Sequence, residues 1–234
     1  MIDKIEQIMK NDKKTFCEFL TCFYNKGLAQ ILCEYKDNKN FWFRRVNEQF
    51  GINDMFIYCE DKDYFEKTIS SFDGFVITTI TTFVVCPVQS NWKISERRQF
   101  YKDIADSDSC NAVRLDETHK TFVDNSVSDT TKDNYSVAIE FDESCYGLVD
   151  LELYCFASVS EVNKANITEI SWIHTEPQHR NKGYAAKLLG AVSDLYVKKG
   201  MLVTYHCDSE NIASAKTALK SGFKETVTEI ILEK

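Results

Sequence analysis

No stretch of the sequence approaches the roughly 20 uninterrupted apolar residues that a membrane helix requires. The apolar core of a secretory signal is missing too, because charged residues stand at positions 3, 4 and 6. From these two absences we predict a cytoplasmic protein that has no membrane partner.

A basic stripe is also missing. Lysine and arginine together number 28 against 36 aspartates and glutamates, which gives a formal net charge of -8. This balance argues against a partner with a phosphate backbone, so we predict no nucleic-acid binding. An acidic surface instead favours a cationic small molecule or a basic peptide as the partner.

Cysteine motifs for metal binding are absent as well. The nine cysteines include no C-x-x-C pair, their number is odd and their spacing is irregular. Most lie within apolar runs, as Cys155 does between Tyr154 and Phe156. This pattern predicts free buried thiols in a reducing compartment and no metal site.

What the sequence does contain is enough apolar material for a folded core. It is 44% hydrophobic and 13% aromatic over 234 residues, which is typical of a globular protein with one large domain or two small ones. The main change in composition is a polar, turn-forming stretch over Asn125–Asn134. We predict that it links an N-terminal α/β domain of unknown role, residues 1–125, to a second domain over residues 134–234.

In the N-terminal part, apolar residues recur every three to four positions over Ile2–Tyr35, which predicts helix. β-Branched and aromatic residues predict strands over Met55–Cys59 and Phe75–Val88. Another helix is expected over Ser95–Ala105, with Ser95 as its cap. No motif in this part indicates a chemical role.

The C-terminal part alternates strands and helices in the expected order β-β-β-α-β-α-β. Turns are expected at 142–144 and 163–166, and Gly200 and Gly222 stand where the two helices should end. The strands are predicted over Tyr135–Phe141, Leu148–Ser158, Ile167–Thr175, Met201–Cys207 and Phe223–Leu232, and the helices over Tyr184–Lys199 and Ala213–Ser221.

The segment from Ile173 to Ala185 carries recognisable chemistry. A strand ends, a loop with Pro177 turns, and a helix begins near the letters R-N-K-G-Y-A. The free amides and the dipole of a helix's first turn attract an anion, and Gly183 lets the backbone approach a ligand closely. The charges of residues 180 and 182 add to this field. The segment therefore predicts an anion-binding loop, with an ordinary basic loop before a helix as the alternative.

R-N-K-G-Y-A resembles the acetyl-CoA pyrophosphate signature of the GNAT acetyltransferase superfamily, Arg/Gln-x-x-Gly-x-Gly/Ala. The upstream spacing from Thr175 through Pro177 to Arg180 also fits that superfamily, and Asn211, Ser214 and the closing Gly-Phe at 222–223 are similar to its second signature. The resemblance covers residues 134–234 and implies the GNAT fold, a mixed and mostly antiparallel sheet flanked by helices. More narrowly, the motifs are similar to the zwittermicin-resistance type of GNAT protein, which also carries a long N-terminal part.

The resemblance implies acetyl-CoA as cosubstrate and assigns its contacts residue by residue. The end of the strand would line the pantetheine arm, with backbone groups of residues 173 and 175 facing it, and the loop amides would hold the pyrophosphate. Asn211 would contact the pantetheine region, with help from Ser214. The implied cofactor-binding residues are Ile173, His174, Thr175, Arg180, Asn181, Lys182, Gly183, Tyr184, Ala185, Asn211 and Ser214.

Two departures from the superfamily pattern stand out. Ala218 occupies the position of a tyrosine that often protonates the leaving thiolate. The sequence also stops soon after Phe223, which leaves little room for the superfamily's last strand. The N-terminal part or another subunit would then complete the sheet, so a homodimer is left open.

Acetyl transfer to an amine also requires a base, because an alkylamine with a pKa of roughly 10 is mostly protonated at neutral pH. Glu169 is the predicted base, because it resembles the strand glutamate of some GNAT enzymes. Strand alternation would put it on one face with residues 171, 173 and 175, and residues 170, 172 and 174 on the other. His174 is the alternative base. The proton for the leaving thiolate would come from Tyr205, His206 or Cys207, or the thiolate would leave unassisted.

The predicted function is therefore transfer of the acetyl group of acetyl-CoA to a primary amine by direct attack, and we expect that amine to belong to a small molecule. Two alternatives stay open. One is a non-catalytic acetyl-CoA-binding module, which the alanine at position 218 favours. The other is acetylation of a protein amino group.

Overall fold

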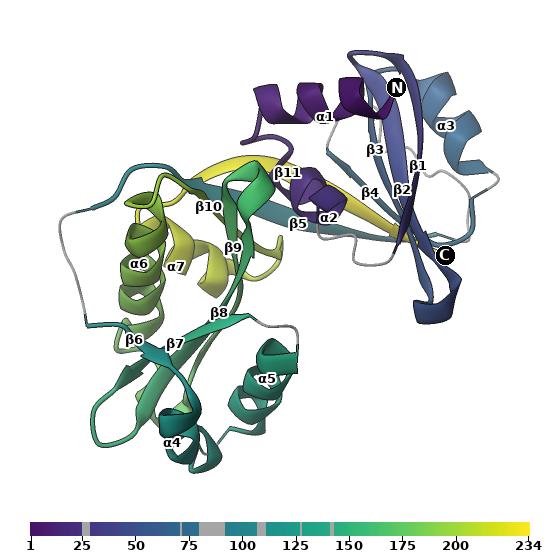
Figure 1. Ribbon diagram of the computed structural model, residues 1–234. Coiled ribbons are helices and arrows are strands. Elements are labelled where there is room, and N and C mark those ends of the chain that lie inside the picture. The colour runs from purple at the N-terminus through teal and green to yellow at the C-terminus, as the bar shows by residue number, and fades with distance from the viewer. Residues whose placement is uncertain (25–28, 71, 80–91, 107–110, 127, 141–142) are drawn as a thin grey trace. The chain divides into compact units, whose positions relative to one another are not determined.

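The computed structural model describes residues 1–24, 29–70, 72–79, 92–106, 111–126, 128–140 and 143–234 (Figure 1). They form two compact units. The first unit comprises Met1–Gln99, Cys207–Glu210 and Thr226–Lys234, and the second comprises Phe100–His206 and Asn211–Glu225. Three strands contribute residues to both units: β5 (Lys93–Lys102), β10 (Leu202–Asp208) and β11 (Lys224–Glu233). The two domains predicted from the sequence, 1–125 and 134–234, stay a prediction.

The first unit is a sheet with helices packed on both faces. Its strands follow the order β1-β2-β3-β4-β11, in which only β3 and β4 are parallel neighbours. The last strand of the chain thus completes this sheet, through pairing of residues 229–233 with residues 75–79. The other elements are α1 (Ile2–Asn11), α2 (Cys17–Tyr24), β1 (Gln30–Asp37), β2 (Asn40–Asn47), β3 (Ile52–Cys59), α3 (Lys62–Ser70) and β4 (Phe75–Thr79).

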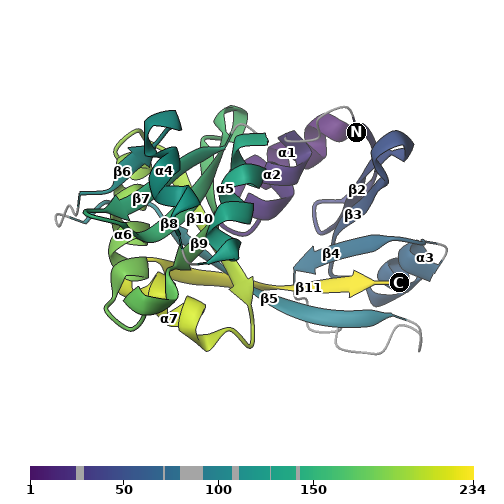
Figure 2. The ribbon, with the colours of Figure 1, turned by 90° about the horizontal axis from the view of Figure 1, so that it is seen from below.

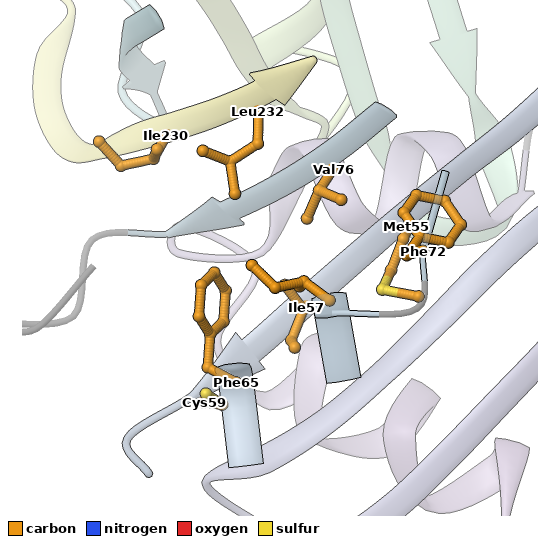
Figure 3. Close-up of a cluster of buried hydrophobic side chains, with 9 residues drawn as sticks. Met55, Ile57, Cys59, Phe65, Phe72, Val76, Ile230 and Leu232 are labelled. Atoms are coloured by element: carbon orange, nitrogen blue, oxygen red, sulfur yellow. The ribbon is translucent and has the colours of Figure 1, made fainter. Parts of the chain in front are cut away.

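Alternation along the strands explains the two apolar layers of the first unit. On one face, Phe43 of β2 and Phe56 of β3 stack at 4.8 Å and meet Phe19 of α2 edge-on. On the other face, α3 contributes Phe65 to a second buried cluster with residues of β3, β4 and β11 (Figure 3). That cluster contains Met55, Ile57, Cys59, Phe65, Ile69, Phe72, Val76, Ile230 and Leu232.

Several expectations for the N-terminal part are confirmed and others are wrong. Met55–Cys59 lies within β3, and β4 confirms the start of the strand predicted over Phe75–Val88, whose residues 80–88 lie outside the described part of the chain. The helix predicted up to Tyr35 ends at Tyr24, because residues 30–37 pair with β2 as a strand. The helix predicted over Ser95–Ala105 is wrong, because residues 93–102 form β5.

The second unit is also a sheet between two helical layers. Its strand order is β10-β9-β8-β7-β6, and only β10 and β9 are parallel neighbours. Helices α6 and α7 lie on one face of the sheet and α4 and α5 on the other (Figures 1 and 2). The elements are β6 (Val113–Leu115), α4 (Lys120–Asp124), α5 (Asp129–Glu140), β7 (Ser144–Val149), β8 (Leu153–Val162), β9 (Ile167–Thr175), α6 (Tyr184–Val197) and α7 (Ile212–Lys220).

The elements that follow residue 160 agree with the sequence. β9 has the predicted bounds, and the helices and strands after it agree within two residues at each end. Gly200 and Gly222 have φ angles of 81° and 83°, the left-handed conformation expected after a helix.

The part of the second unit before residue 160 differs from the prediction. The polar stretch Asn125–Asn134 is not wholly a linker, because α5 begins within it, and the same helix replaces the strand predicted over Tyr135–Phe141. The strand predicted over Leu148–Ser158 is two strands, and the hairpin turn lies at 150–152 instead of 142–144. The helix was missed because a side chain distant in sequence, that of Glu176, holds its start.

Seven cysteines lie in the part of the chain that the structure describes, and none of these seven forms a disulfide, as predicted; five are buried, whereas Cys22 and Cys33 are half-buried. Cys86 and Cys110 fall outside that part. Among the described helices, none is long and apolar enough to cross a membrane.

Candidate active site

Strands β9 and β10 separate beyond their first paired residues. Their parallel register joins Ile167–Ile170 to Leu202–Tyr205 and stops there, although β9 continues to residue 175. On its other side, β9 stays paired with β8 up to Thr175. The backbone of β9 is therefore not paired with β10 over its C-terminal half; we call this break in the pairing the opening, and it is the splay that a pantetheine arm requires.

Two residues of β9 direct backbone groups into this opening. The amide of Glu176 donates to the carbonyl of Tyr154 at 3.0 Å, which makes these two residues a hydrogen-bonded pair of the antiparallel ladder. Because such pairs alternate along a ladder, Ile173 and Thr175 point their amides and carbonyls away from β8. His174 lies between them, and its backbone points toward β8. The amides at 173 and 175 and the carbonyl of Ile173 thus face the opening, whereas the carbonyl of Thr175 accepts from Arg180 and the backbone of His174 is turned the other way.

The loop after β9 has the geometry of an anion cradle. Gly183 directly precedes α6 with φ of 78°, and no heavy atom lies within 4 Å of the place where its Cβ would be. Asn181 also has a positive φ, 61°. The amides of the first turn of α6, from Tyr184 onward, have no acceptor within the helix. Bare amides, open space and the positive end of a 14-residue helix fit a pyrophosphate.

The two cationic side chains of the cradle brace the loop. Arg180 donates through Nε to the carbonyl oxygen of Thr175 at 3.2 Å, and Lys182 donates through Nζ to the carbonyl of Gln178 at 3.2 Å. Their charges stay close to the cradle, but these atoms already hold the backbone in shape. The groups that the loop leaves for an anion are therefore mainly its backbone amides.

An aromatic cluster beside the cradle was not anticipated from the sequence. The rings of Tyr154 and Tyr184 stack at 5.1 Å, and the ring of His179 lies 4.4 Å from that of Tyr154. His179 Nε2 lies 3.0 Å from a carboxylate oxygen of Glu152 in the β7–β8 turn. Tyr184 was predicted from the sequence for its amide, whereas Tyr154, His179 and Glu152 were missed because their contacts join the loop to a distant hairpin. The cluster packs His179 of the loop and Tyr184, the first residue of α6, against Tyr154 of β8.

Asn211 and Ser214 both lie at the start of α7. The side-chain oxygen of Asn211 accepts from the Ser214 amide at 3.1 Å and caps the helix. The Ser214 hydroxyl is 2.6 Å from the hydroxyl of Tyr205, which stands at the last paired position of β10. Ala218, one turn further along α7, is fully buried. The structure thus brings together Tyr205 and the second signature at the mouth of the opening.

A β-bulge interrupts β9 at Ser171. Ser158 of β8 lies opposite Trp172, whereas the next residue, Val159, lies opposite Ile170. Ser171 is therefore an extra residue without an opposite partner on β8. Because a bulge shifts the register by one residue, the alternation of side chains changes face across it.

The bulge corrects the predicted faces of β9. Residues opposite each other on paired strands share a face. Glu169 consequently lies on the same face as Trp172 and His174, and the face opposite to it carries Ile173 and Thr175. The predicted grouping of Glu169 with residues 173 and 175 is wrong, because simple alternation does not account for the extra residue.

Glu169 belongs to a cluster of polar side chains on this face. One of its carboxylate oxygens is 3.3 Å from Nδ1 of His206, two residues beyond its neighbour on β10. On the β7 side, the Ser171 hydroxyl donates to Glu143 at 3.3 Å. Burial raises the pKa of Glu143, and the negative charge of Glu169 adds to this effect, while the hydrogen bond from Ser171 opposes it. Two carboxylates thus share the site.

Glu143 was missed from the sequence because it falls in a segment predicted to be a hairpin turn. His174, the alternative base, lies on the same face as Glu169 by register. Burial lowers the pKa of His174, which keeps its ring neutral at physiological pH. A neutral imidazole is able to accept a proton, so His174 stays a candidate base.

The family and fold comparisons agree with this geometry. Residues 91–224 match the family described as acetyltransferase (GNAT) domain. Among solved structures, a Drosophila protein is similar over 100% of this chain and 95% of its own, with 11% identity and a TM-score of 0.65. A GNAT-family acetyltransferase from Colwellia psychrerythraea has 13% identity, 97% and 95% coverage and a TM-score of 0.57.

A GCN5-related N-acetyltransferase from Sphaerobacter thermophilus is similar over 84% of this chain and 76% of its own, with 12% identity and a TM-score of 0.51. At such identities these structures establish the fold alone. No curated protein matches the sequence.

Proposed function

Because the chain belongs to the acetyltransferase (GNAT) family, we propose that it transfers the acetyl group of acetyl-CoA to a primary amine of a small molecule. The protein is an acyltransferase, and GNAT-fold proteins use acetyl-CoA. The observation that carries the proposal is the opening beside β9, which ends at the cradle and has Glu169 where the two strands separate.

Each part of the cosubstrate has a matching group in the second unit. The amides of Arg180 through Ala185 hold the pyrophosphate, and backbone groups of Ile173 and Thr175 hold the pantetheine arm. Asn211 and Ser214 stand at the other side of the opening. When bound, acetyl-CoA supplies an activated acyl group as a thioester.

The chain's own residues then manage two protons. Glu169 accepts a proton from the acceptor ammonium, directly or through water, so that the neutral amine attacks the carbonyl carbon of the thioester. When protonated, His206 stabilises the negative charge of the neighbouring Glu169 carboxylate. As the C–S bond breaks, Tyr205 donates a proton to the departing sulfur from the last paired position of β10, and the second proton of the attacking nitrogen returns to the Tyr205 oxygen through solvent. No step requires a metal.

Two other functions remain candidates. A non-catalytic acetyl-CoA-binding module is favoured by the small, buried Ala218 at the position of the usual acid. Acetylation of a protein amino group uses the same chemistry on a larger acceptor. The zwittermicin-resistance type of GNAT protein, a cytoplasmic location and a homodimer are retained as finer parts of the proposal.

Release of free thiol from acetyl-CoA against a panel of amines tests the function. The panel should contain small diamines, amino acid amides and a lysine-containing peptide. We expect turnover with at least one small primary amine and slower turnover with the peptide. Tight acetyl-CoA binding without turnover of any amine favours the binding module, and preference for the peptide favours protein acetylation.

A further inference from the structure

Glu176 is a buried carboxylate between the cofactor loop and α5. It directly precedes Pro177 and is only 1% exposed. One of its carboxylate oxygens accepts from the amide of Ser128 at 3.0 Å, and the other accepts from the hydroxyl of Thr131, which is itself buried. A buried carboxylate is costly unless it is hydrogen-bonded. These bonds therefore fix the loop to the first turn of α5.

The bonds replace a local helix cap. The first amides of a helix lack acceptors within the helix, and a nearby side chain usually satisfies one of them. At the start of α5 the acceptor for the amide of Ser128 comes instead from Glu176, 48 residues later in the chain. Its negative charge also lies at the positive end of the helix dipole. The start of α5 thus depends on the conformation of the cofactor loop.

The far end of α5 reaches the polar cluster around Glu169. The carbonyl of Ala138 accepts from the amide of Glu143 at 2.8 Å, and Glu143 accepts from Ser171 through its side chain. Along the way, the ring of Tyr135 packs edge-on against Phe156 of β8. The helix has 12 residues and a length of about 18 Å. The helix thus connects Glu176, at the start of the cofactor loop, to Glu143, beside Glu169.

We propose that Glu176 is a positioning residue that couples acetyl-CoA binding to the acceptor site through α5. This inference rests on the proposed function. Acetyl-CoA in the cradle restrains residues 176–185, and Glu176 transmits that restraint to Ser128 and Thr131. The position of α5 then sets Glu143 against Ser171 on the face that carries Glu169. By linkage, acetyl-CoA and the amine raise each other's affinity by the same factor.

Hydrogen exchange of the full-length protein with and without acetyl-CoA tests the coupling without relying on turnover. In the wild type we expect acetyl-CoA to slow exchange in the first half of α5 about tenfold, within the usual range of such coupling. Thr131→Val keeps the shape of the side chain and removes one bond to Glu176. This variant should bind acetyl-CoA with an affinity within about threefold of wild type, and it should lose most of the protection from exchange in the first half of α5.

Three further variants separate positioning from simple loss of stability. Glu176→Ala removes both bonds, whereas Glu176→Gln keeps the size and polarity of the side chain and should restore most of the protection. Asp133→Asn changes an exposed carboxylate on the same helix and should behave as wild type. In steady-state kinetics, Thr131→Val should raise the KM of the amine about tenfold with little change in kcat.

The possible outcomes are distinguishable. Absence of acetyl-CoA binding to the wild type would overturn the proposed function and this inference with it. Binding without slower exchange in α5 overturns the inference alone. Full protection and an unchanged amine KM in both Thr131→Val and Glu176→Ala would also overturn it.

Discussion

Lys102 and Asp194 form a buried ion pair in the second unit, with 2.7 Å between Nζ and a carboxylate oxygen. The lysine is 2% exposed and the aspartate 4%. Lys102 also donates to the backbone carbonyl of Ser221 at 2.9 Å and lies 2.9 Å from a carboxylate oxygen of Asp106. The pair therefore links the end of β5 to α6 and to the turn after α7, which together support the two cofactor signatures.

Lys102→Met should destabilise the protein by about 3–5 kcal/mol, because it leaves the carboxylate of Asp194 buried without a cation. Urea unfolding at pH 7 measures the loss. Lys224→Met is the control, since Lys224 is largely exposed and 3.7 Å from Asp103, and its loss should cost less than about 1 kcal/mol. Adding Asp194→Asn to Lys102→Met should recover part of the stability. A single Lys102 variant as stable as the control would contradict the argument.

The sequence predicts elements best where the signals are local. The bounds of β9 follow from a β-branched run between the left-handed Asn166 and Pro177, and α6 follows from its apolar face and Gly200. Helix α5 was missed because its start depends on Glu176, which is distant in sequence. Without that partner, a polar sequence such as 125–134 is predicted to be a loop. Only pairing between strands reveals the bulge at Ser171.

The same limit applies to the candidate site. The cradle could be predicted because a single segment provides its amides and its glycine. The cluster on the other face combines residues from β7, β9 and β10, so Glu143 and the contact of Glu169 with His206 had no signature in the sequence. β5 was wrongly predicted as a helix. Its polar residues have partners that are distant in the sequence, such as Glu229 for Arg97, and local patterns do not show these partners.

Glu143→Gln should stabilise the protein at neutral pH. Burial raises the pKa of Glu143 in the folded state above its value in the unfolded chain, so the folded state holds the proton more tightly. Stability is then lost as the pH rises from the unfolded pKa through the folded one. Glutamine keeps the acceptor for Ser171 and cannot ionise. We expect a higher Tm than wild type at pH 7 and a difference that vanishes below about pH 4.

A matched variant checks this pH dependence. Glu117→Gln replaces an exposed glutamate at a distance from the cluster and should show no such trend. Thermal unfolding between pH 4 and pH 8 gives both curves. If Glu143→Gln is less stable than wild type at pH 7, the ionised carboxylate is stabilised by its surroundings and the burial argument is wrong.

Gly183→Asp should abolish acetyl-CoA binding, because it adds a negative charge where the pyrophosphate meets bare amides. Titration calorimetry should show at least about a 100-fold loss of affinity, or roughly 2.7 kcal/mol. Gly200→Asp is a close control, since Gly200 has φ of 81° and equally open surroundings but lies after α6. Both variants carry the same backbone strain, and only the first should lose the ligand. Equal affinity in the two variants would disprove the cradle assignment.

Glu169→Gln should lower kcat/KM about 100-fold or more near neutral pH, which is typical for the loss of a positioned base. Glutamine keeps the size of the side chain and its contact with His206, so acetyl-CoA affinity should be unchanged. Glu161→Gln is the control, because Glu161 lies on the opposite face of β8 and bonds to Tyr196. Steady-state kinetics of both variants from pH 6 to pH 10 give the comparison.

The pH dependence of that loss identifies the role of Glu169. A base becomes unnecessary when the amine deprotonates by itself, so the defect should shrink as the pH approaches the amine pKa of roughly 10. If Glu169 only attracts the ammonium, KM should rise while kcat is unchanged. A fully active Glu169→Gln together with an inactive His174→Ala would make His174 the base. Both residues lie on one face of β9, so the register allows either outcome and the kinetics decide between them.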